Sequence, residues 1–339
     1  MTERKFNDNF IAFTAILLWV AYSCIYTALK KNENTAIIAG WLTFIGEVVP
    51  DVIAATLAFL LFKKIKDLQE KKVFFIFFIS LMAITFQDFV YTVSVNLLNL
   101  QYDSAIILSF LHPTMIIFLL GQLIAWSWIL FTNRIITERN NKWIYVPSVM
   151  VAALIFSMFM LGIPWKVGYF SVIGLPQIIE TILEAVGFPL AAICLIRSST
   201  QLIRFLSAGY LLIISADFII RFSVIEGVIP YLDSVIVIWM LGSWLICLGF
   251  LFFCGDKEKL IKLSPSNSIQ SQIAMWMLSL WLLSAFLFVG TYAIFSGDNH
   301  YGIAQMSKNL LSMIIPFSVL AIISSSYISK KISSPLAKR

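Results

Sequence analysis

The chain has 339 residues and is poor in charge for its length. Lys, Arg, Asp and Glu together make up 12% of it, whereas a soluble domain carries about a quarter. Hydrophobic residues make up 60% of the chain, and the mean hydropathy is +0.91. These apolar positions are too many for one core surrounded by water. The composition therefore excludes a soluble enzyme and predicts a membrane protein.

Ten apolar runs are long enough to cross a bilayer, which takes about 20 residues of helix. In chain order they fall at 8–29, 42–62, 73–97, 104–131, 143–163, 172–196, 204–225, 232–254, 270–295 and 304–328. The sequence therefore predicts an all-α polytopic membrane protein with ten transmembrane helices, in contact with lipid on its outer faces.

The basic residues indicate the orientation of these helices. Most of the 24 lysines and arginines fall at the two ends and in the connections on one side of a ten-helix arrangement. Basic residues near membrane spans stay on the cytoplasmic side. We therefore expect a multi-pass protein of the bacterial inner membrane with both termini in the cytoplasm. The net charge of +6 follows from this topology and calls for no nucleic-acid partner.

Two stretches resemble each other at an offset of 129 residues. Asp88-Phe89-Val90 matches Asp217-Phe218-Ile219, and Asp51 matches Glu180. Internal repeats of this kind indicate a duplicated architecture. Four helices per repeat return the chain to the side where it began, so the halves are parallel. We predict a four-helix repeat at 1–134, a second at 135–265, a transmembrane hairpin at 266–327 and a cytoplasmic linker at 328–339.

Ionisable residues inside the predicted spans are candidates for a functional interior, because such groups are costly in lipid. They fall in the outer halves of their helices and are Glu47, Asp51, Asp88, His112, Glu180, Glu184, Asp217 and Arg221. Acids four residues apart share one face of a helix. We expect a polar cavity, open to the outside, that binds an unknown small ligand or ion. The excess of acids favours a cation, a proton or a hydrogen-bond donor.

Two purely structural interpretations remain for these residues. Asp217 and Arg221 are four residues apart and can simply neutralise each other within the helix bundle. The clustered carboxyl groups can also be protonated and serve as hydrogen bonds between helices.

The sequence contains no motif typical of catalysis or cofactor binding. It has no phosphate-binding glycine loop, HExxH or GxSxG, and these motifs carry the chemistry of common enzyme classes. The four cysteines lack the spacing of a metal site. We therefore predict no enzymatic activity within this chain, no cofactor and no metal site.

The last predicted helix leads into Ile328, then Lys330-Lys331, Ile332 and Pro335-Leu336. Residues 328–339 resemble the start of a HAMP linker, as found after the membrane sensor region of bacterial sensor histidine kinases, diguanylate cyclases and chemoreceptors. The resemblance implies that Ile328, Ile332, Pro335 and Leu336 carry the output signal. It also implies a homodimer through the last helix and linker, with an effector beyond Arg339. It covers only the end of the chain, and the rest of a HAMP unit is missing.

Together these features predict a sensory input module for signal transduction. An extracytoplasmic or intramembrane stimulus would favour one packing of the helices over another, and the last helix would pass the change to the linker. The alternative is a secondary transporter or permease that couples its substrate to protons or cations through the paired carboxylates. A third reading is a membrane scaffold in which the buried acids have no functional role.

Overall fold

The computed structural model describes residues 19–29 apart from 20 and 27, 35–98, 105–132, 174–225 apart from 199, and 232–253. These residues are helical with short turns, and no strand occurs among them. The elements are α2 (Ala36–Gly46), α3 (Val48–Lys64), α4 (Leu68–Tyr91), the π-helix η2 (Thr92–Leu97), α5 (Ala105–Thr132), α7 (Gly174–Arg197), α8 (Gln201–Ile225) and α9 (Leu232–Phe253). The all-α prediction is confirmed for this part of the chain.

Six of the ten predicted spans coincide with these helices. They are 42–62 on α2 and α3, 73–97 on α4 and η2, 104–131 on α5, 172–196 on α7, 204–225 on α8 and 232–254 on α9. The span 8–29 is described only in part, as helical residues within 19–29. The spans 143–163, 270–295 and 304–328 lie outside the described residues, so a total of ten stays a prediction.

Four helical stretches among the described residues are long and apolar enough to cross a membrane. They are Ile37–Lys64, Leu68–Ser94, Ser109–Thr132 and Leu175–Leu195. Large apolar side chains such as Trp41, Phe75 and Leu120 are exposed on their outer surfaces. Exposed apolar faces on long helices indicate a lipid environment, so the structure supports a membrane protein.

The predicted span 42–62 is interrupted at Glu47, where α2 ends and α3 begins. Pro50 has no N–H, and its ring excludes the carbonyl oxygen of Gly46 as a hydrogen-bond acceptor four residues earlier. The Glu47 N–H donates to the carbonyl oxygen of Thr43 at 2.9 Å. Glu47 therefore lies at the junction of two nearly continuous helices.

Both ends of α4 have distinct local structure. At its start, the Asp67 carboxylate accepts hydrogen bonds from the backbone N–H groups of Gln69 (2.8 Å) and Glu70 (3.0 Å), which caps the helix. At its other end, α4 continues into η2 at Thr92. Turns of π-helix are rare and often occur near functional sites, and Asp88 lies one turn before this one.

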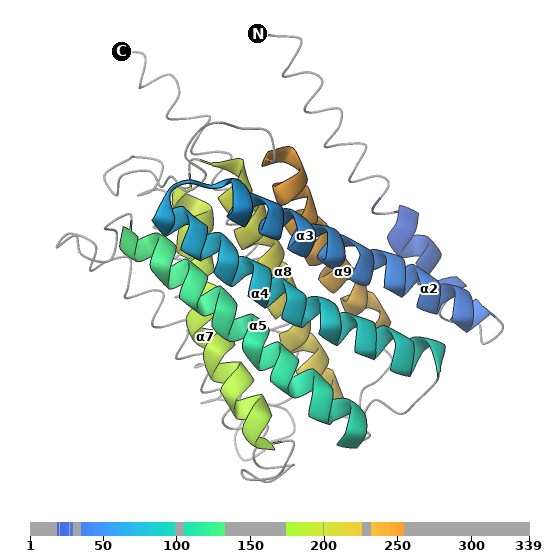
Figure 1. The fold of residues 1–339 in the computed structure, drawn as a ribbon. Coiled ribbons are helices and arrows are strands. Elements are labelled where there is room, and N and C mark those ends of the chain that lie inside the picture. The colour runs from blue at the N-terminus through green and yellow to red at the C-terminus, as the bar shows by residue number, and fades with distance from the viewer. Residues whose placement is uncertain are drawn as a thin grey trace, which may run out of the picture.

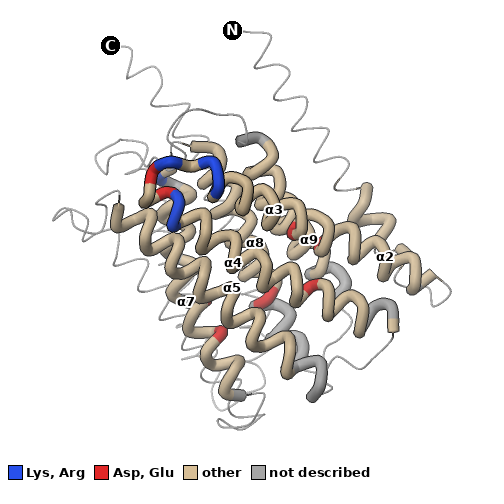
Figure 2. Tube along the Cα trace, viewed as in Figure 1, with Lys and Arg blue, Asp and Glu red and all other residues tan. Residues whose placement is uncertain are grey.

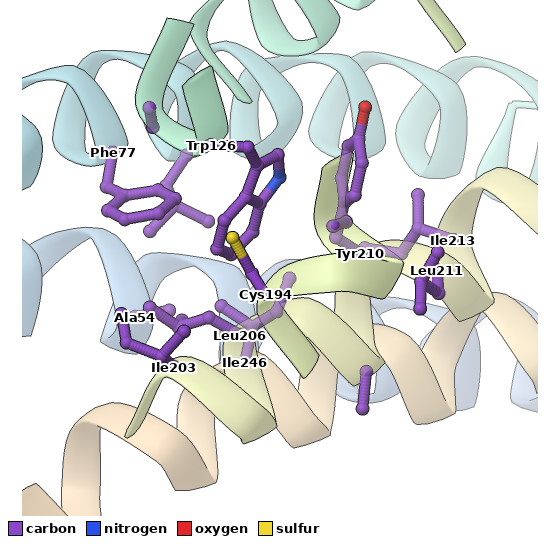
Figure 3. Close-up of a cluster of buried hydrophobic side chains, with 14 of the residues drawn as sticks. Ala54, Phe77, Trp126, Cys194, Ile203, Leu206, Tyr210, Leu211, Ile213 and Ile246 are labelled. Atoms are coloured by element: carbon purple, nitrogen blue, oxygen red, sulfur yellow. The ribbon is translucent and has the colours of Figure 1, made fainter. Parts of the chain in front are cut away.

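Six of the described helices contact one another in a closed order, α3 to α4, α5, α7, α8, α9 and back to α3. In Figure 1, α8 and α9 lie behind α3, α4 and α5. Side chains fill the space between: Phe74 of α4 packs against Phe250 of α9. Trp126 of α5 lies between Phe77 of α4 and Tyr210 of α8 (Figure 3). We call this arrangement the helix ring, and α2 lies at its edge.

Helices α8 and α9 approach each other backbone to backbone. A Cβ atom on Gly209 would lie 2.6 Å from the carbonyl oxygen of Gly242, and one on Gly242 would lie 2.8 Å from that of Gly209. Small residues permit such close packing between membrane helices. The absence of side chains at these two glycines therefore allows α8 and α9 to pack in direct contact on one side of the ring.

Charged residues are separated along the helices. Basic residues gather at the connection of α3 and α4, beside Asp67 and Glu70, whereas the other acidic positions of the helices lie farther along, away from that connection (Figure 2). The basic residues there are Lys63, Lys64, Lys66, Lys71 and Lys72. This separation leaves the buried acids far from the lysines of the connection.

Candidate functional site

The first polar cluster lies where α3, α4 and α9 meet. Its members are Glu47, Asp51, Asp88, Trp239 and Ser243, and we call it the Asp51 cluster. The indole N–H of Trp239 donates a hydrogen bond to Oδ2 of Asp88 at 3.2 Å. The carboxyl group of Asp51 interacts with the Asp88 carboxyl and with the Ser243 hydroxyl. The cluster therefore links three helices through polar side chains.

The Asp51 cluster is closed to solvent. The exposed fraction is 0% for Asp51 and Ser243 and 3% for Glu47 and Asp88. Neither carboxyl oxygen of Asp51 makes a hydrogen bond of ordinary geometry in the structure, and neither does the Ser243 hydroxyl. Buried polar groups of native proteins are nearly always hydrogen-bonded. Asp51 and Ser243 are therefore exceptions that need an explanation.

The side of the Asp51 cluster near α2 is closed by Tyr22. Its hydroxyl donates to the backbone carbonyl oxygen of Leu42, and its ring lies close enough to Glu47 for the two side chains to interact. A Cβ atom on Gly46 would lie 2.7 Å from the Tyr22 hydroxyl and 2.6 Å from Sδ of Met240. The absence of a side chain at Gly46 thus allows both residues to pack over the α2–α3 junction.

The second polar cluster lies where α5, α7 and α8 meet. Its members are His112, Glu180, Glu184 and Tyr210, and we call it the Glu180 cluster. Nδ1 of His112 lies 2.8 Å from Oε1 of Glu180, and the two side chains are 12% and 3% exposed. This contact is an ion pair when the imidazole is protonated and a hydrogen bond when it is neutral. It joins α5 directly to α7.

Glu184 lies one helical turn beyond Glu180, is fully buried and interacts with Tyr210 of α8. A Cβ atom on Gly187 would clash with the Tyr210 hydroxyl. The Tyr210 ring packs against Phe118 at 5.9 Å and Trp126 at 6.0 Å between ring centroids. The aromatic core therefore fixes the position of the tyrosine next to Glu184.

The structure brings together six of the eight ionisable residues predicted for the site, three in each cluster. Asp217 lies in α8 and is partly buried, and Arg221 lies one turn farther along the same helix, so their pairing stays a prediction. The linker residues Ile328, Ile332, Pro335 and Leu336 lie outside the described part of the chain.

The predicted cavity open to the outside is wrong for the buried carboxyl groups. Glu47, Asp51, Asp88, Glu180 and Glu184 have exposed fractions of 0–3%. Neighbouring helices cover these side chains, because in a closed ring each polar face meets another helix. Among the described residues, no group of three or more His, Cys, Asp or Glu side chains could hold a metal ion.

Sequence reasoning missed the partners of these acids. Trp239 and Ser243 are four residues apart on α9, so they share one face, and this spacing on an apolar helix is a signal that could have found them. Tyr210 carries no comparable signal. A third polar contact, between α4 and α5, was also missed: Gln122 donates to the Ser80 hydroxyl at 3.0 Å, which donates to the carbonyl oxygen of Phe118 at 2.9 Å.

The fold and the two clusters define an all-helical protein whose long apolar helices indicate a membrane environment. Comparison of the chain with protein-family models, curated proteins and solved structures found no match in any of the three. The function is therefore inferred from the geometry of the clusters.

Proposed function

We propose that this chain is a membrane-embedded sensory input module for signal transduction. The observation that carries the proposal is that buried polar contacts join helices distant in sequence: Trp239 to Asp88 across 151 positions and His112 to Glu180 across 68. The packing of the ring thus depends on a few titratable groups. A stimulus that changes their charge or partners shifts the equilibrium between two packings.

The helix ring also supports the proposal of a duplicated body, with α3–α4–α5 as one half and α7–α8–α9 as the other. The two contacts that close the ring, α5 with α7 and α9 with α3, then join the third helix of one half to the first of the other. Under this proposal His112 and Ser243 both lie on a third helix and both face an acid on a first helix. The two clusters therefore lie at corresponding helix junctions of the ring, although His112 and Ser243 occupy different positions along their helices.

Burial supports the correspondence between the first helices. Buried positions of the first half recur 133 residues later in α7: Glu47, Val48, Asp51, Ala54, Ala55, Ala58 and Leu61 correspond to Glu180, Thr181, Glu184, Gly187, Phe188, Ala191 and Cys194. This offset differs by one helical turn from the 129 taken from the sequence. It pairs Glu47 with Glu180 and Asp51 with Glu184, so that both acid pairs match as pairs.

The third helices correspond at an offset of 121. The buried residues Met115, Phe118, Leu119, Gln122, Ala125, Trp126 and Ile129 of α5 correspond to Ile236, Trp239, Met240, Ser243, Ile246, Cys247 and Phe250 of α9. The smaller offset reflects a shorter chain between the second and third helices of the second half. Under this correspondence, Gln122 and Ser243 are equivalent buried polar positions.

In this proposal the output leaves through the last predicted helix and the HAMP-like segment Ile328–Arg339. Two copies of the chain pair through a parallel coiled coil, in which a small shift or rotation carries the signal. The lysines at the α3–α4 connection support a cytoplasmic location for that side of the bundle. The proposed location is a bacterial inner membrane with both termini in the cytoplasm.

A cross-linking experiment tests the proposal. Ile328→Cys and Ile332→Cys are introduced separately into a chain without its native cysteines, and disulfide formation between copies is measured in membranes. Asp88→Asn and Glu180→Gln, one change in each cluster, are expected to alter the rate severalfold. Asp67→Asn, which keeps an exposed helix cap, is the matched control and is expected to change nothing.

Two results would contradict the proposal. The absence of cross-links at both positions would exclude a dimer through the linker. Cross-links that form at the same rate in all variants would show that the clusters do not communicate with the last helix.

The alternative function is a secondary transporter that couples its substrate to protons. The observation in its favour is the contact between the carboxyl groups of Asp51 and Asp88, because paired acids are typical of proton relays in membranes. Proton uptake into proteoliposomes, measured with an enclosed pH-sensitive dye, tests this alternative. Substrate-dependent uptake that Asp51→Asn abolishes would replace the sensory proposal.

A further inference from the structure

We propose that Asp51 and Asp88 share a single proton, which is bonded to Asp51 and forms a hydrogen bond to the Asp88 carboxylate. This inference rests on the proposed sensory function and names the ligand of the Asp51 cluster. The stimulus would then be the loss or gain of this proton.

The two carboxyl groups differ in their partners. The indole N–H of Trp239 can only donate a hydrogen bond, and it does so to Oδ2 of Asp88 at 3.2 Å. This contact favours an ionised Asp88, because hydrogen bonds to charged acceptors are stronger than those to neutral ones. Asp51 accepts no hydrogen bond from an N–H donor among the described residues, and the Ser243 hydroxyl approaches it without ordinary hydrogen-bond geometry. Asp88 is therefore the acceptor of the pair, and Asp51 is the residue that carries the proton.

None of the side chains that the structure describes around the pair supplies a compensating positive charge. The groups that face Asp51 are Asp88 from α4, Ser243 and Cys247 from α9, and Glu47 from its own end of α3. No lysine, arginine or histidine of the described residues faces the pair. Two ionised carboxylates in contact and out of water would repel each other strongly. One bound proton removes a charge and supplies the missing hydrogen-bond donor.

The buried hydroxyl of Ser243, which approaches Asp51 without an ordinary hydrogen bond, is the independent observation that points to a ligand. It is 0% exposed, faces Asp51 and makes no hydrogen bond of ordinary geometry. When Asp51 loses its proton, this hydroxyl can rotate and donate to the new carboxylate, because a hydroxyl hydrogen turns freely about the C–O bond. The Ser243 hydroxyl is thus available as a hydrogen-bond donor to Asp51 when Asp51 is deprotonated.

A proton fits this site better than a metal ion. The described residues contain no group of three or more His, Cys, Asp or Glu side chains arranged for a metal. The burial of both carboxyl groups leaves no exposed ligand for a hydrated cation. A proton needs only the two oxygens that already face each other.

Infrared spectroscopy of the purified full chain in lipid bilayers tests this proposal. A neutral carboxylic acid gives a C=O stretch separate from the carboxylate bands. We expect Asp51 to contribute to this band, and that contribution should be lost at high pH and absent in Asp51→Asn. Ser243→Ala removes the hydroxyl that can donate to the deprotonated Asp51 and should raise the pH at which the band disappears, whereas Trp239→Phe should shift it less, because the Trp239 N–H donates to Asp88 both before and after Asp51 loses its proton. Asp67→Asn is the control and keeps the band.

Several outcomes would overturn the inference. The band could remain unchanged in Asp51→Asn, or Trp239→Phe could shift its titration more than Ser243→Ala does. If Asp51→Asn does not fold, Ser243→Ala provides the test, and an unchanged titration in that variant contradicts the proposal.

The cross-linking experiment separates this inference from the proposed function. A titrating Asp51 proton with linker cross-links that never change would keep the proton site and exclude the sensory role. Cross-links that respond to Asp88→Asn, without any proton on Asp51, would keep the sensory role and exclude the proton site.

Discussion

The two polar clusters of the helix ring hold buried acids in different ways. In the Glu180 cluster, an acid of α7 meets a base: His112 of α5 lies 2.8 Å from Glu180. In the Asp51 cluster, an acid of α3 meets a second acid, an indole N–H and a hydroxyl group. A carboxylate next to a protonated imidazole can stay ionised inside a protein. Two adjacent buried carboxyl groups cannot both stay ionised, so such a pair binds a proton.

This difference indicates a division of roles between the halves of the ring. The Glu180 cluster is a direct contact between helices, reinforced by an aromatic core around Tyr210. Each cluster contains a buried polar group without an ordinary hydrogen bond, such as the Tyr210 hydroxyl in one and the Asp51 carboxyl in the other, but the Asp51 cluster also lies next to a helix break at Glu47 and a π-helix after Asp88. We therefore expect the Glu180 cluster to contribute more to stability and the Asp51 cluster to respond more readily to its surroundings.

The largest loss of stability is expected from His112→Ala. This change removes the bond from the imidazole to a buried acid, and hydrogen bonds to charged groups contribute about 1.5–3 kcal/mol. The free energy of unfolding in mixed detergent micelles measures the effect. His112→Gln, which can still donate to Glu180, serves as the control and should recover much of the loss. A loss below that of Trp239→Phe would reverse the proposed ranking of the clusters.

A pair of glycine substitutions compares the packing of the two clusters. Gly187→Ala pushes against Tyr210, which two aromatic rings hold in place, and should cost about 2 kcal/mol, as overpacking of a rigid core does. Gly46→Ala meets the flexible end of Met240 and the Tyr22 hydroxyl and should cost less, because methionine adapts its shape. The same unfolding measurement applies. Equal losses would mean that the two clusters are equally rigid.

A smaller effect is expected from Trp239→Phe, which removes the N–H donor to Asp88 while keeping an aromatic ring. The loss of one hydrogen bond to an ionised carboxylate should cost about 1.5 kcal/mol, the low end for such bonds, because the contact is long at 3.2 Å. Trp126→Phe is the matched control: it loses a similar area, but its buried indole N–H makes no hydrogen bond in the structure. A loss in Trp239→Phe no greater than in the control would show that the bond to Asp88 adds no stability.

The smallest effect is expected from Asp67→Asn, which lies in neither cluster. Asparagine caps a helix about as well as aspartate, so the free energy of unfolding should change by less than about 0.5 kcal/mol. This variant sets the baseline against which both clusters are compared. A larger change would mean that the negative charge at the α3–α4 connection contributes to stability beyond its role as a cap.

The positions of the helices could be predicted from the sequence more easily than their contacts. The predicted span 104–131 corresponds to α5 (Ala105–Thr132), and 232–254 corresponds to α9 (Leu232–Phe253), because a long apolar run has one stable conformation in lipid. The break at Glu47 was not predicted, although Pro50 carried the signal for it. The acid pair Glu47/Asp51 was recognised, but its burial was not.

The sequence by itself determined the all-helical class, the apolar spans and which acidic residues lie inside them, because length, hydropathy and charge are local properties of the chain. Only the tertiary structure decided that His112 meets Glu180, that Trp239 meets Asp88 and that Asp51 lies without an ordinary hydrogen bond. The physical reason is that these helices are apolar on most of their surface, with only a few polar positions. No apolar stripe marks their inner face, so the rotation of each helix and the partner of each acid follow from packing against neighbours.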